Sequence, residues 1–258
     1  MIKFFRSIRQ QLLSENKFSK YLLYAIGEII LVVIGILIAL SINNWNEGRK
    51  LENDRLKLMR DLKKELLINK ASLDNHLLGL QINNSQLNKV INFSAGTLEL
   101  PIDSLRIYSS NLIYPIDLSI LNSVQEEAIS AGKFEILSDN LKHQLSILKD
   151  YSESRVKIDE KLKESILNKD TEVINLILNL SAFPDIPERF YVQQPTSMHP
   201  DFIKSDDELV SLIKSSKTYS TIFQIYYLSI TDQIWIKYGL LNHTNETIEL
   251  IEKELNEK

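Results

Sequence analysis

An almost unbroken apolar run at residues 22–42 constrains this chain more than any other feature of its sequence. The run carries one charged side chain, that of Glu28. A helix rises about 1.5 Å per residue, so a helix of this length covers the roughly 30 Å hydrocarbon core of a bilayer. Tyr21 precedes the run and Trp45 follows it, at the depths where membrane proteins place aromatic rings. The run predicts a transmembrane helix over residues 21–45.

A cleaved signal peptide is the alternative to an uncleaved anchor. Ala39-Leu40-Ser41 weakly resembles the small-residue site at which signal peptides are cut. The apolar run is, however, longer than the apolar region of an ordinary signal peptide, and about 20 residues precede it. These two features favour the anchor.

Basic residues flank the run on both sides, so a count of Lys and Arg alone barely orients it. Five precede it and five follow it: Lys3, Arg6, Arg9, Lys17 and Lys20, then Arg49, Lys50, Arg55, Lys57 and Arg60. A short basic N-terminus before a first and only span usually stays in the cytoplasm. We therefore expect the N-terminus inside and the C-terminal domain outside.

Residues 1–20 form a basic amphipathic segment, in which Ile2, Phe5, Ile8 and Leu12 follow helical spacing. Such a segment either lies as a helix at the lipid headgroups or is a flexible basic tail.

Glu28, Gly35 and Ala39 fall near one line of the predicted transmembrane helix. Gly35 and Ala39 form a pair of small residues four apart, which lets two helix backbones approach closely. A carboxylate within the hydrocarbon marks by default a position that faces protein or water. We predict that this face associates with a second copy of the chain or with a membrane protein partner. The alternative is that Glu28 reaches the nearby interface.

The stretch SENKFSKYLLYAIGEIILVVIGILIALSINNWNEGRK, residues 14–50, resembles the N-terminal signature of a family of unknown function. That family consists of small single-pass membrane proteins common in Bacteroidota. The specific parts are Tyr24-Ala25-Ile26-Gly27-Glu28, the aliphatic run, and the closing Asn43-Asn44-Trp45-Asn46. The resemblance implies a bacterial inner-membrane protein with a helical domain, which the orientation above places in the periplasm. It implies no catalytic or binding residues.

The composition of the chain narrows the classes of function. The net charge of −4 argues against a nucleic-acid partner, because phosphate binding needs a concentrated basic surface. The absence of cysteine removes disulfides, thiolate catalysis and cysteine metal sites. Only 7 glycines and 6 prolines occur in 258 residues, which favours helices.

A seam of heptad spacing follows the anchor. Leucines recur every seven residues, and the second seam position is polar three times; we single out Leu66, Asn69, Leu73, His76, Leu80, Asn83 and Leu87. One interpretation is a parallel coiled-coil stalk that dimerises the protein. The other is a long helix that packs inside its own chain's bundle. We favour the bundle, because further long helical segments follow and need a surface to pack on.

Further helices are predicted between residues 118 and 258. One spans Leu118–Ala131 and ends at Gly132; another starts after an N-cap at Ser138-Asp139 and runs to Leu180, with its stripe disturbed at 151–159. Ser205–Glu208 matches a capping box, and helix continues to the C-terminus with a hinge near Ser215-Ser216. We expect its apolar face at Tyr219, Ile222, Tyr226, Ile230, Ile234 and Leu241. Residues 184–204 hold four of the six prolines and form either a contact loop or a crossover between helices.

No pattern for catalysis is present. The chain has no Gly-rich phosphate loop, no HExxH and no GxSxG, and its four histidines lie on different predicted elements. We expect no enzyme activity, no cofactor and no metal site. The predicted fold is all-α: one N-terminal transmembrane helix, then an antiparallel helical-bundle domain with long helices over residues 46–258.

We expect an interaction or scaffold role at the membrane. A sensory, ligand-binding domain that signals through a membrane partner is the second hypothesis, and a membrane-tethered enzyme is the third. A closed apolar core with exposed apolar side chains would favour the first; a deep polar pocket with clustered histidines and carboxylates would favour the third.

Overall fold

The computed structural model describes residues 18–109, 118–167, 171–181, 199 and 204–257. Over these residues the regular structure is helical, with no strand. The predicted all-α fold is confirmed. The chain divides into two compact units, Met1–Lys57 and Leu58–Lys258, and each is described by itself.

The first unit is dominated by the start of α2, a helix of 77 residues that spans Phe18–Ser94. Its large apolar side chains between Leu22 and Leu51 are exposed. Among the described residues, α2 is the helix long and apolar enough to cross a membrane, and its most apolar stretch has no buried residue. Apolar side chains without a protein core around them fit a lipid environment. Residues 1–17 of the predicted amphipathic segment lie outside the described residues.

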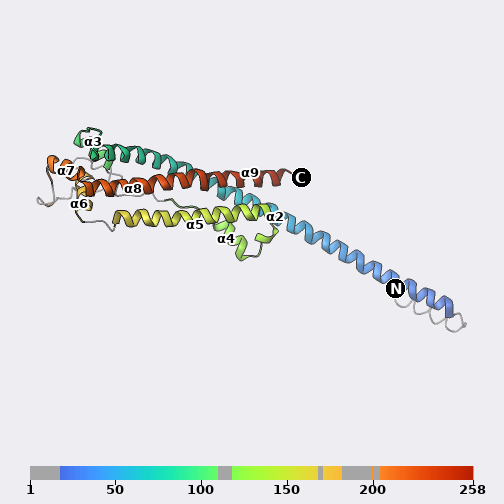
Figure 1. The fold of residues 1–258 in the computed structure, drawn as a ribbon. Coiled ribbons are helices and arrows are strands. Elements are labelled where there is room, and N and C mark those ends of the chain that lie inside the picture. Colours follow the sequence, from blue (N-terminus) through green and yellow to red (C-terminus); the bar gives the residue numbers. More distant parts are fainter. Residues whose placement is uncertain (1–17, 110–117, 168–170, 182–198, 200–203, 258) are drawn as a thin grey trace. The chain divides into compact units, whose positions relative to one another are not determined.

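The second unit is a bundle built on the rest of α2 (Figure 1). Its further elements are α3 (Ile102–Ser109), α4 (Ser123–Ser130), η2 (Phe134–Ile136), α5 (Asp139–Leu167), α6 (Thr171–Ser181), α7 (Asp206–Ile213), α8 (Ser216–Trp235), η5 (Ile236–Leu241) and α9 (Asn242–Asn256). The helix that contains α8 and α9 runs antiparallel to α2, since Lys70 contacts Asn245 whereas Asn84 contacts Gln233.

Three apolar clusters fill the bundle. The first joins α2 to α8 with α5 and α6, and includes Leu87, Val90, Ile222 and Ile225. The second closes one end with α3, α6 and α7, around Phe93, Leu105 and Ile213. The third packs Leu73 and Leu80 of α2 on Ile236 and Leu240 of η5. Each fully buried leucine or isoleucine stabilises the fold by about 1.5–3 kcal/mol relative to an exposed one.

The ends of several helices confirm the predicted caps. Gly132 lies at C′ of α4 with φ of 66°, and the N–H of Lys133 donates to the carbonyl of Ala128 at 2.8 Å. Ser138 caps α5 by accepting the N–H of Leu141 at 3.1 Å. The predicted capping box is complete, because Ser205 and Glu208 satisfy each other's backbone N–H. The hinge at Ser215-Ser216 is the break between α7 and α8.

One predicted helix boundary and one residue of a predicted buried face are wrong. Residues 118–122 are not helical, and α4 begins only at Ser123. Of the helix predicted from 139 to 180, residues 139–167 form α5 and residues 171–180 lie in α6, while 168–170 lie outside the described residues; α5 continues without interruption through 151–159. Residues 184–204, apart from 199 and 204, lie outside the described residues.

The second correction concerns one residue of the predicted face, Ile234 of α8. The buried residues of α8 include Ile222, Ile225, Ser229 and Asp232, whereas Ile234 of the predicted face is exposed. The other residues of the predicted face are buried or half-buried, and Tyr219, Ile222, Tyr226 and Leu241 belong to or pack on the apolar clusters. Asp232 is buried because Arg155 of α5 donates hydrogen bonds to both of its carboxylate oxygens.

Candidate functional site

The seam predicted on α2 faces the interior of the bundle. Leu66, Asn69, Leu73, His76, Leu80 and Leu87 are buried, whereas Asn83 is only half-buried. The neighbouring Asn84 is buried instead and donates from Nδ2 to Oε1 of Gln233 at 2.7 Å. The residues that pack on this seam belong to the same chain.

Asn69, the first polar residue of the seam, binds the non-helical residues 118–122 to α2. Its Nδ2 donates to the carbonyl of Leu121 at 2.7 Å, and its Oδ1 accepts the N–H of Leu121 at 2.8 Å. The side-chain amide thus satisfies both backbone groups of a residue that has no helical partner. This contact explains why residues 118–122 leave the predicted helix.

Glu65, one turn before Asn69 on α2, binds the first residues of α4. Its Oε2 accepts the hydroxyl of Ser123 at 2.7 Å and the N–H of Val124 at 2.9 Å, at the first turn of α4. A carboxylate is favoured there because the first N–H groups of a helix lack partners and carry partial positive charge. Glu65 and Asn69 together hold the start of α4 on α2.

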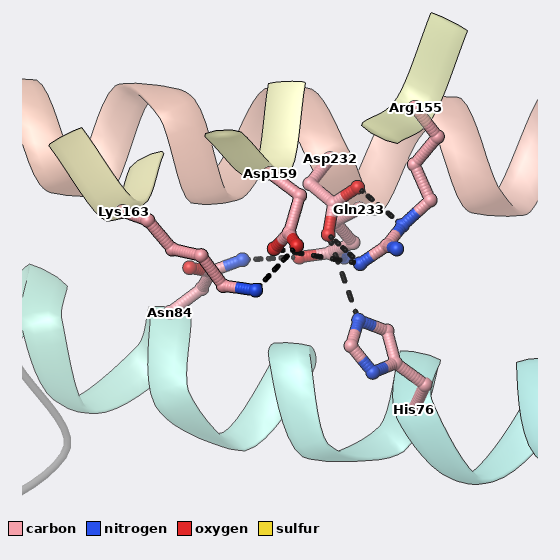
Figure 2. Close-up of polar contacts among 7 residues, drawn as sticks. All are labelled: His76, Asn84, Arg155, Asp159, Lys163, Asp232 and Gln233. Atoms are coloured by element: carbon pink, nitrogen blue, oxygen red, sulfur yellow. Dashed lines mark hydrogen bonds and ion pairs between the residues drawn. The ribbon is translucent and has the colours of Figure 1, made fainter. Parts of the chain in front are cut away.

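A charged cluster lies deeper in the bundle, between α2, α5 and α8 (Figure 2). Arg155 of α5 donates from Nε to Oδ1 of Asp232 at 3.1 Å and from Nη2 to Oδ2 at 3.3 Å. Both side chains are only 4% exposed. This two-pronged geometry is the strongest arrangement of a guanidinium with a carboxylate.

His76 brings the third helix into this cluster. Its Nε2 lies 3.5 Å from Oδ2 of Asp232, and its side chain is 3% exposed. Within the described part of the chain neither ring nitrogen makes a hydrogen bond. The carboxylate of Asp232 therefore lies between a guanidinium of α5 and an imidazole of α2 (Figure 2).

Asp159 and Lys163 extend the cluster toward solvent along α5. Oδ1 of Asp159 lies 4.0 Å from Nη2 of Arg155, and its Oδ2 lies 3.0 Å from Nζ of Lys163. The charges alternate from Lys163 through Asp159 and Arg155 to Asp232. Burying any one of these charges alone would be costly, and the opposite charge beside each one offsets the cost of burying Arg155 and Asp232.

This arrangement connects three helices. Asp232 binds Arg155 through both of its oxygens, which fixes the register of α8 against α5. Among the described residues no three His, Asp or Glu side chains come together as metal ligands would. The sequence analysis did not single out Arg155 or Asp232. The one signal for each was a charged residue that interrupts the apolar spacing of its predicted helix.

The outer face of α8 and η5 carries a row of large apolar side chains. Phe223, Tyr227, Ile234 and Tyr238 are spaced by four, seven and four residues and are 46–63% exposed. We call these four residues the apolar stripe. They occupy different positions on the helix from the buried Ile225, Ser229 and Asp232 described above, because α8 has 3.6 residues per turn. Contiguous exposed apolar residues are a feature of interaction sites.

A π-helical turn, η5, follows α8 and changes the phase of the helix before α9. Within it, buried Gly239 lies against Tyr151 of α5: a Cβ at this position would come within 2.5 Å of the Tyr151 ring. The Tyr151 ring also lies 5.2 Å from that of Trp235, whose Nε1 donates to the Tyr151 carbonyl at 3.1 Å. The Tyr151 ring can pack this close to η5 because Gly239 has no side chain.

The residues predicted for helix association lie on the exposed part of α2. Gly35 and Ala39 are exposed, and a Cβ added to Gly35 would meet no atom within 4 Å. Glu28 is partly exposed and lies in the same helix. A face with Gly35 and Ala39 four residues apart is open to a second helix.

Comparison with known proteins adds one finding to this geometry. Residues 28–102 are similar to a family of unknown function (DUF6090). The matched region runs from Glu28 through the whole seam of α2 to the start of α3. No curated protein and no solved structure matches the chain.

The matched region thus includes both the exposed apolar part of α2 and its bundle-facing part. It holds Glu28, Gly35, Ala39 and all seven seam residues. The family match therefore concerns the long helix α2, whereas the apolar stripe and Arg155 lie outside it.

Proposed function

We propose that this protein is a single-pass protein of the bacterial inner membrane that serves as an interaction module. Its N-terminus would lie in the cytoplasm and its helical domain in the periplasm. The role is non-catalytic: the bundle would present a fixed surface to a protein partner, and α2 would hold that surface at the membrane.

The observation that carries this proposal is the apolar stripe. The bundle has ample apolar core, yet Phe223, Tyr227, Ile234 and Tyr238 remain exposed on one helix. Aromatic side chains are enriched at the centres of protein interfaces because they bury large area with few rotatable bonds. Tyr227 and Tyr238 have these properties and also carry hydroxyls that remain hydrated until a partner binds.

Photo-crosslinking in intact membranes tests the proposed interaction. A photoreactive amino acid at Tyr227 or Ile234 is expected to capture the same partner protein, identified by mass spectrometry. The same amino acid at Glu249, an exposed residue of α9, is the control and is expected to capture much less. Recovery of nothing beyond the protein itself from both stripe positions would refute the interaction role.

Orientation is tested separately with a reporter fused to the C-terminus. A periplasmic domain predicts activity from a reporter that works only outside the cytoplasm, and silence from one that works only inside. The reverse pattern would overturn the proposed topology while leaving the apolar stripe intact as an interaction surface.

The transmembrane part of the proposal is that α2 helices associate through Glu28, Gly35 and Ala39. Small residues let backbones approach, and a carboxylate in the span gains from a protein partner. We expect Glu28→Leu to weaken association in a transmembrane reporter assay. Ile34→Leu, at an exposed position of the same span, is the matched control.

A further inference from the structure

A cavity of about 240 Å³ lies in the bundle, away from the apolar stripe. It is bounded by α2, by the segment that leads into α4, by α5, and by the junction of η5 with α9. No residue of the apolar stripe lines it. A ligand bound in this cavity would therefore be separate from the partner proposed above.

The inner wall of the cavity is mostly apolar. Leu62, Leu66, Leu145 and Leu240 line it and are buried. Three buried polar residues also line it and are already hydrogen-bonded: Asn69 to the backbone of Leu121, Glu65 to Ser123 and Val124, and Thr244 to the carbonyl of Leu240. The deep part of the cavity thus suits an apolar body.

The charged residues that line the cavity are unbalanced. They are three carboxylates and one ammonium: Glu65, Glu126, Glu153 and Lys149. Glu126 and Glu153 are exposed and lie at the mouth on α4 and α5, where Lys149 Nζ is 3.8 Å from Oε1 of Glu153. Clefts lined by an excess of one charge attract ligands of the opposite charge.

We propose that this cavity binds a small amphipathic cation, with its apolar body against the leucines and its ammonium head between Glu126 and Glu153. The volume sets the size of the ligand. A cavity of about 150 Å³ holds benzene, so one of this size holds about ten non-hydrogen atoms.

The lid of the site is α4. Its one buried residue is Ala128, and Glu65 and Asn69 attach its N-terminal end to α2 by the hydrogen bonds described above. Segments with so few buried contacts open locally at low free-energy cost. A ligand that contacts both α4 and α5 holds the lid closed, so binding slows amide hydrogen exchange in residues 123–130.

Three probes with one apolar body separate the contribution of charge from that of shape. They are 3-phenylpropylammonium, 3-phenylpropan-1-ol and 3-phenylpropanoate. Each is titrated calorimetrically into the full chain in lipid nanodiscs, with empty nanodiscs as the blank for partition into lipid. We expect the ammonium to bind at least about threefold more tightly than the alcohol, and the carboxylate to bind most weakly. Equal binding of all three, or no binding, would overturn the proposal.

Paired variants localise the site. Glu126→Gln combined with Glu153→Gln is expected to remove the preference for ammonium over alcohol, while the alcohol binds as before. Glu127→Gln with Glu160→Gln removes two exposed carboxylates from the same two helices outside the lining and is expected to change nothing. A preference that survives the first pair and falls with the second would contradict the assigned position of the head.

Leu148→Trp fills the cavity and is expected to abolish binding of all three probes, whereas Val156→Trp, exposed on the same helix, is not. Undiminished binding to a folded Leu148→Trp protein would place the probes elsewhere. If the Leu148→Trp protein does not fold, the variants of Glu126 and Glu153 still test the site, because both residues are exposed and their replacement leaves the core intact. Failure at the cavity leaves the crosslinking test of the apolar stripe unaffected, so the two proposals fail separately.

Discussion

Replacing Asp232 by asparagine leaves the buried guanidinium of Arg155 without its two-pronged partner, and the structure indicates how much that costs. Both side chains are 4% exposed and are joined at 3.1 Å and 3.3 Å. Breaking a buried ion pair by removing one charge costs about 3–5 kcal/mol, because the remaining charge has lost its hydration. Arg155 keeps Asp159 at 4.0 Å, which places the expected loss near the lower end, at about 3 kcal/mol.

The assay is thermal unfolding of the full chain in nanodiscs, followed by far-UV circular dichroism. For a domain of this size 1 kcal/mol corresponds to roughly 2–4 °C, so Asp232→Asn should lower Tm by about 9 °C. The matched control is Asp206→Asn. Asp206 pairs with Arg106 at a similar 3.0 Å, but its side chain is 61% exposed, and its loss should cost less than about 1 kcal/mol.

A double replacement tests the physical reason itself. Arg155→Met with Asp232→Leu removes both charges and keeps the volume, so Tm should return to within about 4 °C of the unmodified protein. If the double variant is as unstable as Asp232→Asn alone, the penalty does not come from an uncompensated buried charge. If Asp232→Asn is no worse than Asp206→Asn, the buried pair does not hold α5 and α8 together.

Three more changes test other parts of the molecule. Gly239→Ala places a methyl group against the Tyr151 ring and should destabilise the bundle by about 1–3 kcal/mol in the same unfolding assay; unchanged Tm would show that the ring moves aside freely. The N–H of Ser205, then its hydroxyl, hold the pKa of Glu208 below its usual value of 4.5, so this cap stabilises α7 above that pH and is lost as pH falls below it. Hydrogen exchange in α7 should accelerate on acidification in the unmodified protein and depend less on pH in Glu208→Gln; equal pH dependence in both would contradict the assignment. Gly35→Leu should weaken self-association of the span in a transmembrane reporter, and an unchanged signal would remove Gly35 from the association face.

Local chemistry made parts of this fold predictable. The capping box at Ser205–Glu208 and the glycine at position 132 act within one turn of helix, so neighbouring residues suffice to identify them. The length of the apolar run at residues 22–42 is likewise a local property. Six of the seven seam residues of α2 are buried as a simple spacing rule would have them.

The features that the sequence did not reveal depend on partners far along the chain. Residues 118–122 leave the helix because Asn69, about fifty positions earlier, takes both backbone groups of Leu121. Asp232 lies on the buried face of α8 because Arg155, 77 positions earlier, meets it there. A pattern of apolar residues assigns such a carboxylate to the surface, so the predicted face of α8 leaves out Asp232.

The same pattern placed Ile234, a residue of the apolar stripe, on the predicted buried face. Once Ser229 and Asp232 are placed inside, Ile234 must be outside, together with Tyr227 and Tyr238. The apolar spacing therefore counted an exposed residue as core. The distinction between core and surface on α8 is the step from which the proposed interaction role follows.

The central claim, that the apolar stripe is where a partner binds, is tested most directly by one crosslinking measurement in intact membranes. A photoreactive amino acid at Tyr238 reports capture, with Tyr227 either unchanged or replaced by lysine. We predict that Tyr227→Lys abolishes capture of the partner while circular dichroism and membrane insertion stay unchanged, because Tyr227 is 63% exposed and its replacement leaves the core intact. Undiminished capture by the Tyr227→Lys protein would contradict the claim.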